Sequence, residues 1–222
     1  MNLKVSGSTM DRERLKRIVV DVIREMEDAP FITTGVSNRH IHLSRADMDA
    51  LYGPAYQLTP VKELQPGQYA SKETVAVSGP KGKFSSVRIL GPVRGLTQFE
   101  LSLSDTFALG VPCPVNESGN LSGAGRVRIE NPASGAAIER DCAIVAMRHV
   151  HLRPETAGKY GLKDKQLVSL EYSTKGRRLV FADVLLRVSE KFVDEIHLDT
   201  DEANAGAIKN GDLGLIIAGD RV

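Results

Sequence analysis

The histidines are the residues of this sequence whose spacing points most directly to chemistry. Four of the five form two His-x-His pairs, His40 with His42 and His149 with His151, while His197 stands alone. Side chains two residues apart on a β-strand point to the same side, so each pair aims two imidazoles at one point. Neutral imidazole is the commonest protein ligand for zinc and related metals. Two such pairs predict a metal centre, and the alternative interpretation is a polar interface without a metal.

The two pairs lie in a repeated segment of the chain. RHIHL from Arg39 and RHVHL from Arg148 share four of five residues, and each runs into a short helical turn that ends in glycine. Such self-similarity predicts two related halves whose imidazole pairs face each other across a pseudo-twofold axis. The pairs would then hold either two metals or one metal with four nitrogen ligands. A weaker echo links ELSLSDTFALG, from Glu100, with IHLDTDEANAG, from Ile196.

The weaker echo supplies candidates for the remaining ligands. We expect His197 to be the third ligand of one metal. Glu100, which the echo sets against His197, is the candidate for the other, because zinc accepts oxygen as well as nitrogen. The acidic residues that follow His197 either orient imidazoles or form an acidic cap on the first turn of a helix; they are Asp199, Asp201 and Glu202.

Arginines and cysteines complete the set of reactive side chains near these motifs. Arg39 and Arg148 precede the histidine pairs, and Arg94 lies in the segment GPVRGL. An arginine beside a metal site suggests an anion clamp, because its planar guanidinium matches phosphate or carboxylate in two-pronged fashion. The alternative is an ordinary solvated arginine beside a strand. Cys113 and Cys142 are expected to be small, buried and reduced side chains.

The elements that must position these residues are mostly short strands separated by Gly-rich and Pro-containing turns. Strands are expected at 31–36, 74–77, 86–90, 99–103, 126–130, 143–146, 167–172, 179–188 and 213–217. Short helices are expected at 46–52, 154–160 and 200–207, and a longer amphipathic helix at 11–28. Short strands with turns between them are typical of barrels and sandwiches. The helices are too few for a doubly wound parallel sheet, so we predict a mainly β fold.

Composition and missing motifs exclude several classes of protein. The net charge is +1, from 29 basic and 28 acidic residues, which offers no basic excess for nucleic acid or a membrane surface. No apolar stretch approaches the ~20 residues that span a bilayer, and no secretory signal is evident, so we expect a cytoplasmic protein. The sequence contains no nucleophile elbow, Walker loop or dinucleotide fingerprint, which disfavours serine hydrolases, P-loop enzymes and Rossmann dehydrogenases.

From about residue 31 onward, the sequence resembles the PduL-type phosphate propanoyltransferases, the phosphotransacylases associated with bacterial microcompartments. The motifs that carry the resemblance are GVSNRHIHLS, QPGQYA, VRILGPVR, RHVHL and HLDTDEANA. The resemblance implies reversible transfer of a short acyl group, propanoyl or acetyl, between coenzyme A and phosphate at a two-zinc site. Cobalt or iron would accept similar ligands, and the sequence does not fix the length of the acyl chain.

The resemblance also implies a role for individual residues. His40, His42 and Glu100 would hold one zinc. His149, His151 and His197 would hold the other, and Arg94 would hold phosphate. Five further positions match motif residues that line the coenzyme A pocket in this family: Ser37, Lys62, Arg88, Leu90 and Asn204.

The fold that the resemblance implies consists of two small β-barrels capped by short helices. Residues 31–38 with 147–222 would form one barrel and residues 39–146 the other, preceded by a helix and short linker at 1–30. An N-terminal amphipathic helix can recruit members of this family into a microcompartment. Residues 11–28 are therefore a candidate docking segment for shell or cargo proteins, and the alternative is packing within the homo-oligomer that we expect.

Two other functions fit the same residues. A binuclear metallohydrolase would use the same ligands to activate water and would cleave thioesters or esters without phosphate. A non-catalytic metal-binding module would have closed metal sites with no open coordination position.

Overall fold

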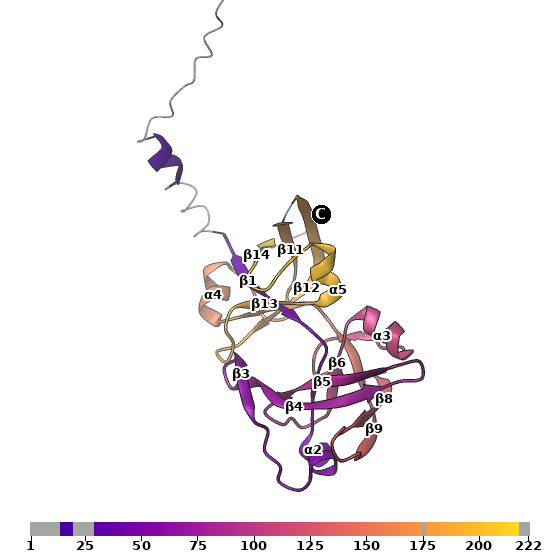
Figure 1. The fold of residues 1–222 in the computed structure, drawn as a ribbon. Coiled ribbons are helices and arrows are strands. Elements are labelled where there is room, and N and C mark those ends of the chain that lie inside the picture. Colours follow the sequence, from indigo (N-terminus) through magenta and orange to yellow (C-terminus); the bar gives the residue numbers. More distant parts are fainter. Residues whose placement is uncertain (1–13, 20–28, 175, 218–222) are drawn as a thin grey trace, which may run out of the picture.

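The structure is a computed structural model that describes residues 14–19, 29–174 and 176–217 (Figure 1). The strands are β1 (Phe31–Ser37), β2 (His40–His42), β3 (Pro60–Gln65), β4 (Gln68–Ser78), β5 (Lys83–Gly91), β6 (Gln98–Glu100), β7 (Val115–Asn116), β8 (Gly125–Glu130), β9 (Ala137–Ala146), β10 (His149–Leu152), β11 (Leu167–Thr174), β12 (Arg177–Val188), β13 (Glu195–Asp199) and β14 (Leu213–Ile217). The helices are α2 (Arg45–Tyr52), α3 (Leu103–Leu109), α4 (Pro154–Lys159) and α5 (Thr200–Ala205).

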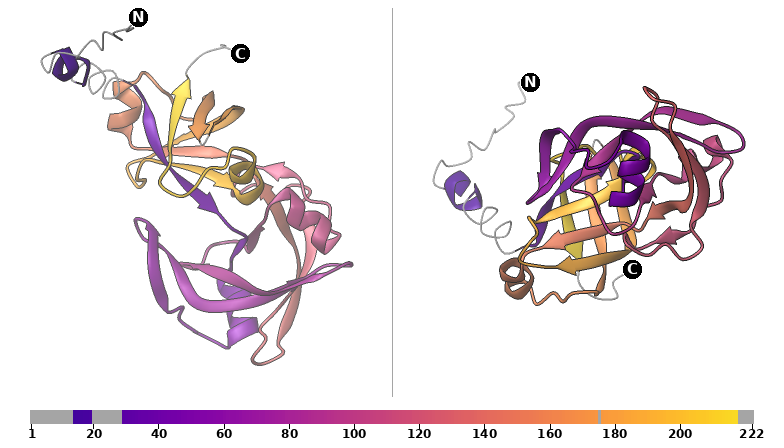
Figure 2. Two further views of the ribbon diagram at one scale, coloured as in Figure 1. Left: turned by 45° about the horizontal axis from the view of Figure 1, so that its top comes forward. Right: turned by 90° about the horizontal axis from the view of Figure 1, so that it is seen from below.

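Six strands close into one barrel in the order β1-β13-β10-β12-β11-β14, because β14 pairs with β1 as well as with β11. The other strands build a second sheet, in which β4, β5, β2, β6, β9 and β8 follow one another and β8 returns to β4. Strands β3 and β7 extend this second ring by pairing with β4 and β9. The expectation of a mainly β fold with two small barrels and short helices is confirmed. Figures 1 and 2 show the two barrels next to each other, with the chain passing from one barrel to the other.

The two rings have the same pattern of pairing around their histidine strands. In the first barrel β10 lies between β12, which is parallel to it, and β13, which is antiparallel. In the second barrel β2 lies between β5, parallel, and β6, antiparallel. The next strand out is parallel in both cases, β1 beside β13 and β9 beside β6. The short repeat in the sequence therefore belongs to a duplication that extends over the strand pairing of both barrels.

Alternation along the histidine strands separates the core from the site. Ile41 and Val150, the middle residues of the two His-x-His pairs, are fully buried and belong to the apolar cores of their respective barrels. Because neighbouring residues on a strand point to opposite faces, the histidines on either side of Ile41 and Val150 point away from those cores. Burial of the two apolar side chains, worth about 1.5–3 kcal/mol each, thus fixes which way the imidazoles face.

The predicted elements match the structure except in a few places. The strand predicted at 99–103 is wrong at its end, since β6 stops at Glu100 and the Ser102 side chain caps α3. Strands β3, β7 and β13 and helix α3 were not predicted, and β2 and β10 were expected only from the argument about the His-x-His pairs. Of the helix predicted at 11–28, residues 14–19 are helical, while 11–13 and 20–28 lie outside the described residues. None of the helices in the described part of the chain is long and apolar enough to cross a bilayer.

Candidate metal centre

The first group of possible ligands lies on β2 and β6. His40 and Glu100 face each other in the antiparallel register of these strands, and His40 Nε2 lies 3.4 Å from Glu100 Oε2. His42 joins them, so that ligand atoms of the three side chains all lie within 4.8 Å of one another. Ligand atoms on a tetrahedral zinc are separated by roughly 3.3–3.5 Å, given bond lengths of about 2.0–2.2 Å. The spacing of His40 and Glu100 therefore suits a shared cation.

Neighbouring groups fix the orientation of these ligands. The Glu100 carboxylate accepts hydrogen bonds from the Gln98 side-chain amide and from Ser118 Oγ, the latter at 2.8 Å. His40 Nδ1 lies 2.9 Å from the Asn38 carbonyl oxygen, which can only accept a hydrogen bond. The proton of a neutral His40 is therefore on Nδ1, and the lone pair of Nε2 faces Glu100. This is the arrangement in which outer partners select the tautomer of a metal-binding histidine.

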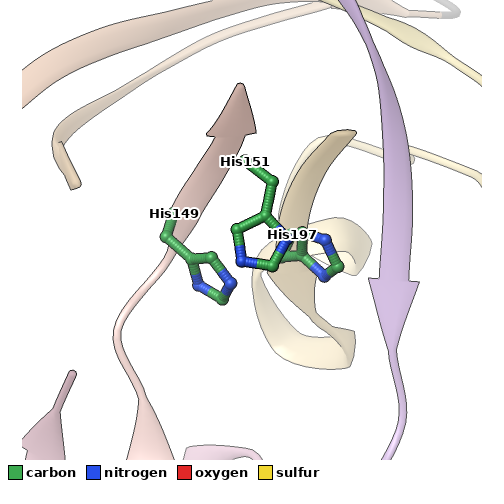
Figure 3. Close-up of side chains that lie close together, drawn as sticks. All are labelled: His149, His151 and His197. Atoms are coloured by element: carbon green, nitrogen blue, oxygen red, sulfur yellow. The ribbon is translucent and has the colours of Figure 1, made fainter. Parts of the chain in front are cut away.

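The second group lies on β10 and β13 and consists of three imidazoles (Figure 3). His149 and His197 are opposite each other in register, with their rings stacked at 4.8 Å between centroids. The His151 ring lies 4.5 Å from that of His197 and stacks on Phe192 at 3.9 Å. His149 Nδ1 lies 2.9 Å from the Met147 carbonyl oxygen, two residues back, just as His40 Nδ1 contacts Asn38. The duplication therefore preserves the orienting contact as well as the ligands.

Burial keeps His42, His149 and His151 neutral. It lowers the pKa of His42 and His149 to about 3, helped by His40 and His197 respectively. Burial likewise lowers the pKa of His151 to about 2, with His197 and His149 contributing. Neutral imidazoles keep the lone pairs that a metal requires.

The pKa of Glu100 is lowered, whereas burial alone would raise the pKa of a carboxyl group. Burial raises its pKa, but His40, His42 and the hydrogen bond from Ser118 outweigh that effect and bring the pKa to about 2. The carboxylate is therefore ionised at neutral pH and available as an oxygen ligand.

Unpartnered nitrogen atoms provide the test of whether a cation fits these groups. Among the described residues, the ring nitrogens that are buried without a hydrogen-bond partner are His42 Nδ1, His197 Nε2 and both nitrogens of His151. Buried polar atoms are nearly always paired in folded proteins, so unpaired nitrogens next to further donors fit a missing ligand. Two imidazoles with a carboxylate, and three imidazoles, are both ligand sets that zinc accepts. Metal binding at the two groups remains a prediction.

Two arginines border the ligand groups. Burial lowers the pKa of Arg94, with Glu100 opposing and Arg187 reinforcing the shift, so Arg94 lies close to both. The hydrogen bond that its side chain forms is weak, since Nη2 donates to Gln68 Oε1 at 3.4 Å. Arg187 on β12 is the register partner of His151. Two like charges beside two ligand groups form a natural place for an anion with several oxygens.

Sequence reasoning missed Arg187 because nothing in its local pattern distinguishes it. It lies inside the strand predicted at 179–188, where an arginine among apolar residues suggests an outward-facing side chain. In the duplicated barrel the corresponding position is Leu90, one residue after the pairing of Ile41 with Ile89. The repeat therefore gives no signal for Arg187 either.

The anion-clamp interpretation of Arg39 and Arg148 is wrong. Arg39 forms two hydrogen bonds, at 2.6 and 2.9 Å, with Asp105, and Arg148 donates to Glu202 at 2.9 Å. Both acids are the third residues of helices, α3 and α5, and both take part in capping boxes. Each guanidinium also lies over a phenylalanine ring, with Arg39 above Phe84 and Arg148 above Phe181.

The acidic residues after His197 have capping and pairing roles. Asp199 caps α5 by accepting a hydrogen bond from Glu202 N at 2.9 Å, and Asp201 accepts one from Ser104 N at 2.7 Å. The interpretation of these residues as a helix cap is therefore the correct one of the two alternatives.

The five positions expected to line a coenzyme A pocket are spread over β1, β3, β5 and α5. Ser37 ends β1 three residues before His40, and Arg88 is the register partner of His40. Arg88 Nη1 donates to the carbonyl oxygens of Ser71 and Lys72 at 2.9 and 2.8 Å. The other three are the exposed Lys62 and Asn204 and the half-buried Leu90. Their role in binding coenzyme A remains a prediction.

Both cysteines are free, as expected. Burial raises the pKa of Cys113 to about 11 and that of Cys142 to about 12. A thiol reacts or binds metal as the thiolate, so neither residue suits a nucleophile or ligand at neutral pH.

Comparison with known proteins places this geometry in a family. Residues 33–209 match the family model described as phosphate propanoyltransferase. A protein of that name from Thermotoga maritima is 50% identical over 200 residues, covering 90% of this chain and 95% of the relative. Phosphate propanoyltransferases from Sebaldella termitidis and Rhodopseudomonas palustris are 46% and 43% identical, each covering more than nine-tenths of both chains. The chain therefore belongs to the phosphate propanoyltransferase family of acyltransferases.

Proposed function

We propose that this protein transfers a short acyl group, propanoyl or acetyl, reversibly between coenzyme A and phosphate at a centre that binds two metal ions. The observation that carries the proposal is the proximity of two ligand groups to two half-buried arginines, Arg94 and Arg187. A metal centre alone would serve many reactions. Two positively charged arginines next to the metal centre offer a binding site for an anion and point to a reaction with phosphate, which agrees with the name of the relatives.

The donor sets assign the metal ligands within this proposal. One ion would be held by the first group and the other by the second; the ligands are His40, His42, Glu100, His149, His151 and His197. Two bound zinc ions supply Lewis acidity toward carbonyl and phosphate oxygens and neutralise charge that develops during the reaction. Coenzyme A would bind residues of β1, β3, β5 and α5, namely Ser37, Lys62, Arg88, Leu90 and Asn204.

The arginines supply the positioning that the reaction needs. In the direction toward acyl phosphate, a phosphate oxygen forms a bond to the thioester carbonyl carbon and the carbon–sulfur bond breaks. Coenzyme A leaves with the electron pair on sulfur, which then takes up a proton. Arg94 and Arg187 bind the other phosphate oxygens and orient the attacking one, and preorganised charge of this kind supplies much of the rate gain in such reactions. No covalent acyl-enzyme is required, in keeping with the protonated thiols of Cys113 and Cys142.

The proposal is tested by measuring release of free thiol from acetyl-, propanoyl- and butanoyl-coenzyme A with and without phosphate, alongside metal analysis of the same preparation. We expect two metal ions per chain, thiol release that requires phosphate, and formation of acyl phosphate in equal amount. Equal release without phosphate would instead identify a metallohydrolase. Metal binding without release under either condition would identify a non-catalytic module.

A further inference from the structure

Glu195 is a carboxylate beside the second group of histidines that none of the sequence motifs identified. It lies on β13 two residues before His197, so both side chains project from the same side of the strand. In the antiparallel register it faces His151. Its Oε2 atom lies 3.2 Å from His197 Nε2, which is within ion-pair distance, although the two atoms do not have the angles of a hydrogen bond. A charged group thus stands next to the imidazole that completes the second group.

The backbone of β1 leaves space for this carboxylate. A Cβ atom at Gly35 would lie 2.8 Å from Glu195 Oε1, closer than such atoms approach, so the carboxylate occupies room that glycine provides. Gly35 is the parallel register partner of His197, on the side of β13 opposite to β10. Glu195 therefore leans over β1 and reaches His197 from the side away from His149. The ligand atoms that lie within 4.8 Å of one another in the second group belong to the three histidines alone, so Glu195 is an outer partner of His197 rather than a member of the group.

The other barrel shows what the same positions look like without this carboxylate. The residue that pairs with Glu100 there, as Gly35 pairs with His197, is Ile144. The residue two before Glu100 is Gln98, where the first barrel has Glu195. Glycine and glutamate thus occur together at one site, and isoleucine and glutamine at the other. The pairing indicates that the room at Gly35 and the carboxylate at Glu195 belong to one feature.

A residue from the opposite barrel holds Glu195 in place. Gln65 at the end of β3 donates from Nε2 to Glu195 Oε2 at 2.9 Å. Its own oxygen accepts a hydrogen bond from Val193 N, also at 2.9 Å. The Gln65 side chain is buried, so both contacts are sheltered from competing water. The β3 strand of one barrel therefore secures a carboxylate that serves the site of the other.

Charge gives the reason why the second group needs such a partner. The first group contains a carboxylate of its own in Glu100, whereas the second consists of three imidazoles, which supply no negative charge, with Arg187 close by. A dication held by neutral ligands near a guanidinium gains from an anion next to one of its ligands. Carboxylates in this outer position fix the orientation of a metal-bound histidine and make it a stronger ligand.

We propose that Glu195 is a positioning residue of the second site, which acts through His197 and supplies the negative charge that the three imidazoles lack. The proposal rests on the two-metal centre of the proposed function. Gln65 and Gly35 are its supports, one by hydrogen bonding and the other by leaving room. No direct contact of Glu195 with substrate is implied.

The test measures metal affinity rather than turnover. Wild type and Glu195→Gln are titrated with zinc against a competing chelator, and the cobalt-loaded proteins are compared by visible absorption. We expect one of the two ions to bind about 10- to 100-fold more weakly in Glu195→Gln, with a changed cobalt spectrum, while the other keeps its affinity. Repeating the comparison in a His42→Ala background, where the second group is the intact one, assigns the weakened ion. Glu195→Asp should recover part of the affinity.

Matched variants separate this role from general effects. Glu171→Gln removes a surface carboxylate of the same barrel, paired with Arg178, and should leave both ions bound as in wild type. Gly35→Ala should weaken the same ion as Glu195→Gln although the carboxylate remains. Wild-type affinity for both ions and an unchanged cobalt spectrum in Glu195→Gln would overturn the proposal. Because no substrate is involved, a protein that binds two ions without transferring acyl groups would refute the proposed function and leave this inference intact.

Discussion

Replacing Arg94 with alanine removes the guanidinium that we propose to bind phosphate. The guanidinium forms little else in the fold. Among the described residues it has one hydrogen bond to another side chain, Gln68, and that bond is long at 3.4 Å. Its backbone, which donates to the Leu43 carbonyl oxygen at 2.9 Å, is unaffected by the substitution. Little of the fold therefore depends on the guanidinium, and most of its donors are available to an anion.

The expected size of the effect follows from the number and kind of bonds that are lost. Hydrogen bonds to a charged group contribute about 1.5–3 kcal/mol each, and about 1.36 kcal/mol corresponds to a factor of ten in rate. Loss of one such contact in the transition state lowers kcat/KM for phosphate by about 10- to 150-fold. Metal content should not fall, because Arg94 is not a ligand and its positive charge opposes a cation at the neighbouring groups.

The assay is phosphate-dependent release of thiol from acyl-coenzyme A at a range of phosphate concentrations, with metal analysis of each preparation. Arg126→Ala is a suitable control, since this exposed arginine pairs with the exposed acids Glu139 and Asp141 and belongs to neither ligand group. Unchanged kinetics for phosphate in Arg94→Ala would refute the assigned role. A loss of activity that accompanies loss of metal would also refute it, because the defect would then lie in the metal centre.

Four further outcomes test other parts of the description. Arg187→Ala should lower kcat/KM for phosphate by about the same factor as Arg94→Ala, and wild-type kinetics would remove Arg187 from the site. The free energy of unfolding of the metal-free protein should fall as the pH drops from about 6.5 toward 3, because histidines take up protons in the unfolded chain but remain neutral when buried in the folded one. Denaturant unfolding at two pH values measures this loss, which should be smaller in His151→Gln. Arg39→Ala should lower the free energy of unfolding by about 1–3 kcal/mol, since it leaves buried Asp105 unpaired, without loss of metal. Removal of residues 1–28 should change either assembly size or recruitment to a microcompartment, and a chain unaltered in both respects would contradict a docking role.

The sequence was sufficient where the relevant residues are close together in it. Each His-x-His pair with its arginine is a contiguous motif, and its repetition revealed the duplication directly. The link from His40 to Glu100 was harder, because it depends on the register of two strands that helix α2 and strands β3, β4 and β5 separate along the chain. A weak echo near His197 made Glu100 a candidate, and only the register brings the two side chains to 3.4 Å. The division of the chain into 31–38 with 147–222 and 39–146 remains a prediction.

Other parts of the site have no local signal to read. Strand β3 is nearly all exposed and begins with proline, so it lacks the apolar alternation that marks a half-buried strand, yet its last residue, Gln65, reaches the opposite barrel. Ser118 lies in a loop and contacts Glu100 only because the chain returns past β6. Arg187 and Glu195 are charged residues in strands, where sequence patterns suggest a solvated side chain. Glu195 is not solvated in this way, because Gln65, more than a hundred residues away in the sequence, forms a hydrogen bond with it.

The differences between the two barrels concern the site more than the scaffold. The arginine before each histidine pair, the acid that it binds and the aromatic ring beneath it all recur, because they hold a capped helix against each barrel. The positions that differ lie in the ligand groups or next to them; they are Glu100 and His197, Gln98 and Glu195, Ile144 and Gly35, and Leu90 and Arg187. One group therefore has its negative charge among the ligands, while the other has it outside them and an arginine alongside. The two sites would therefore differ in net charge and in metal affinity, and the duplication would yield two unlike halves of one reaction centre rather than two copies of one site.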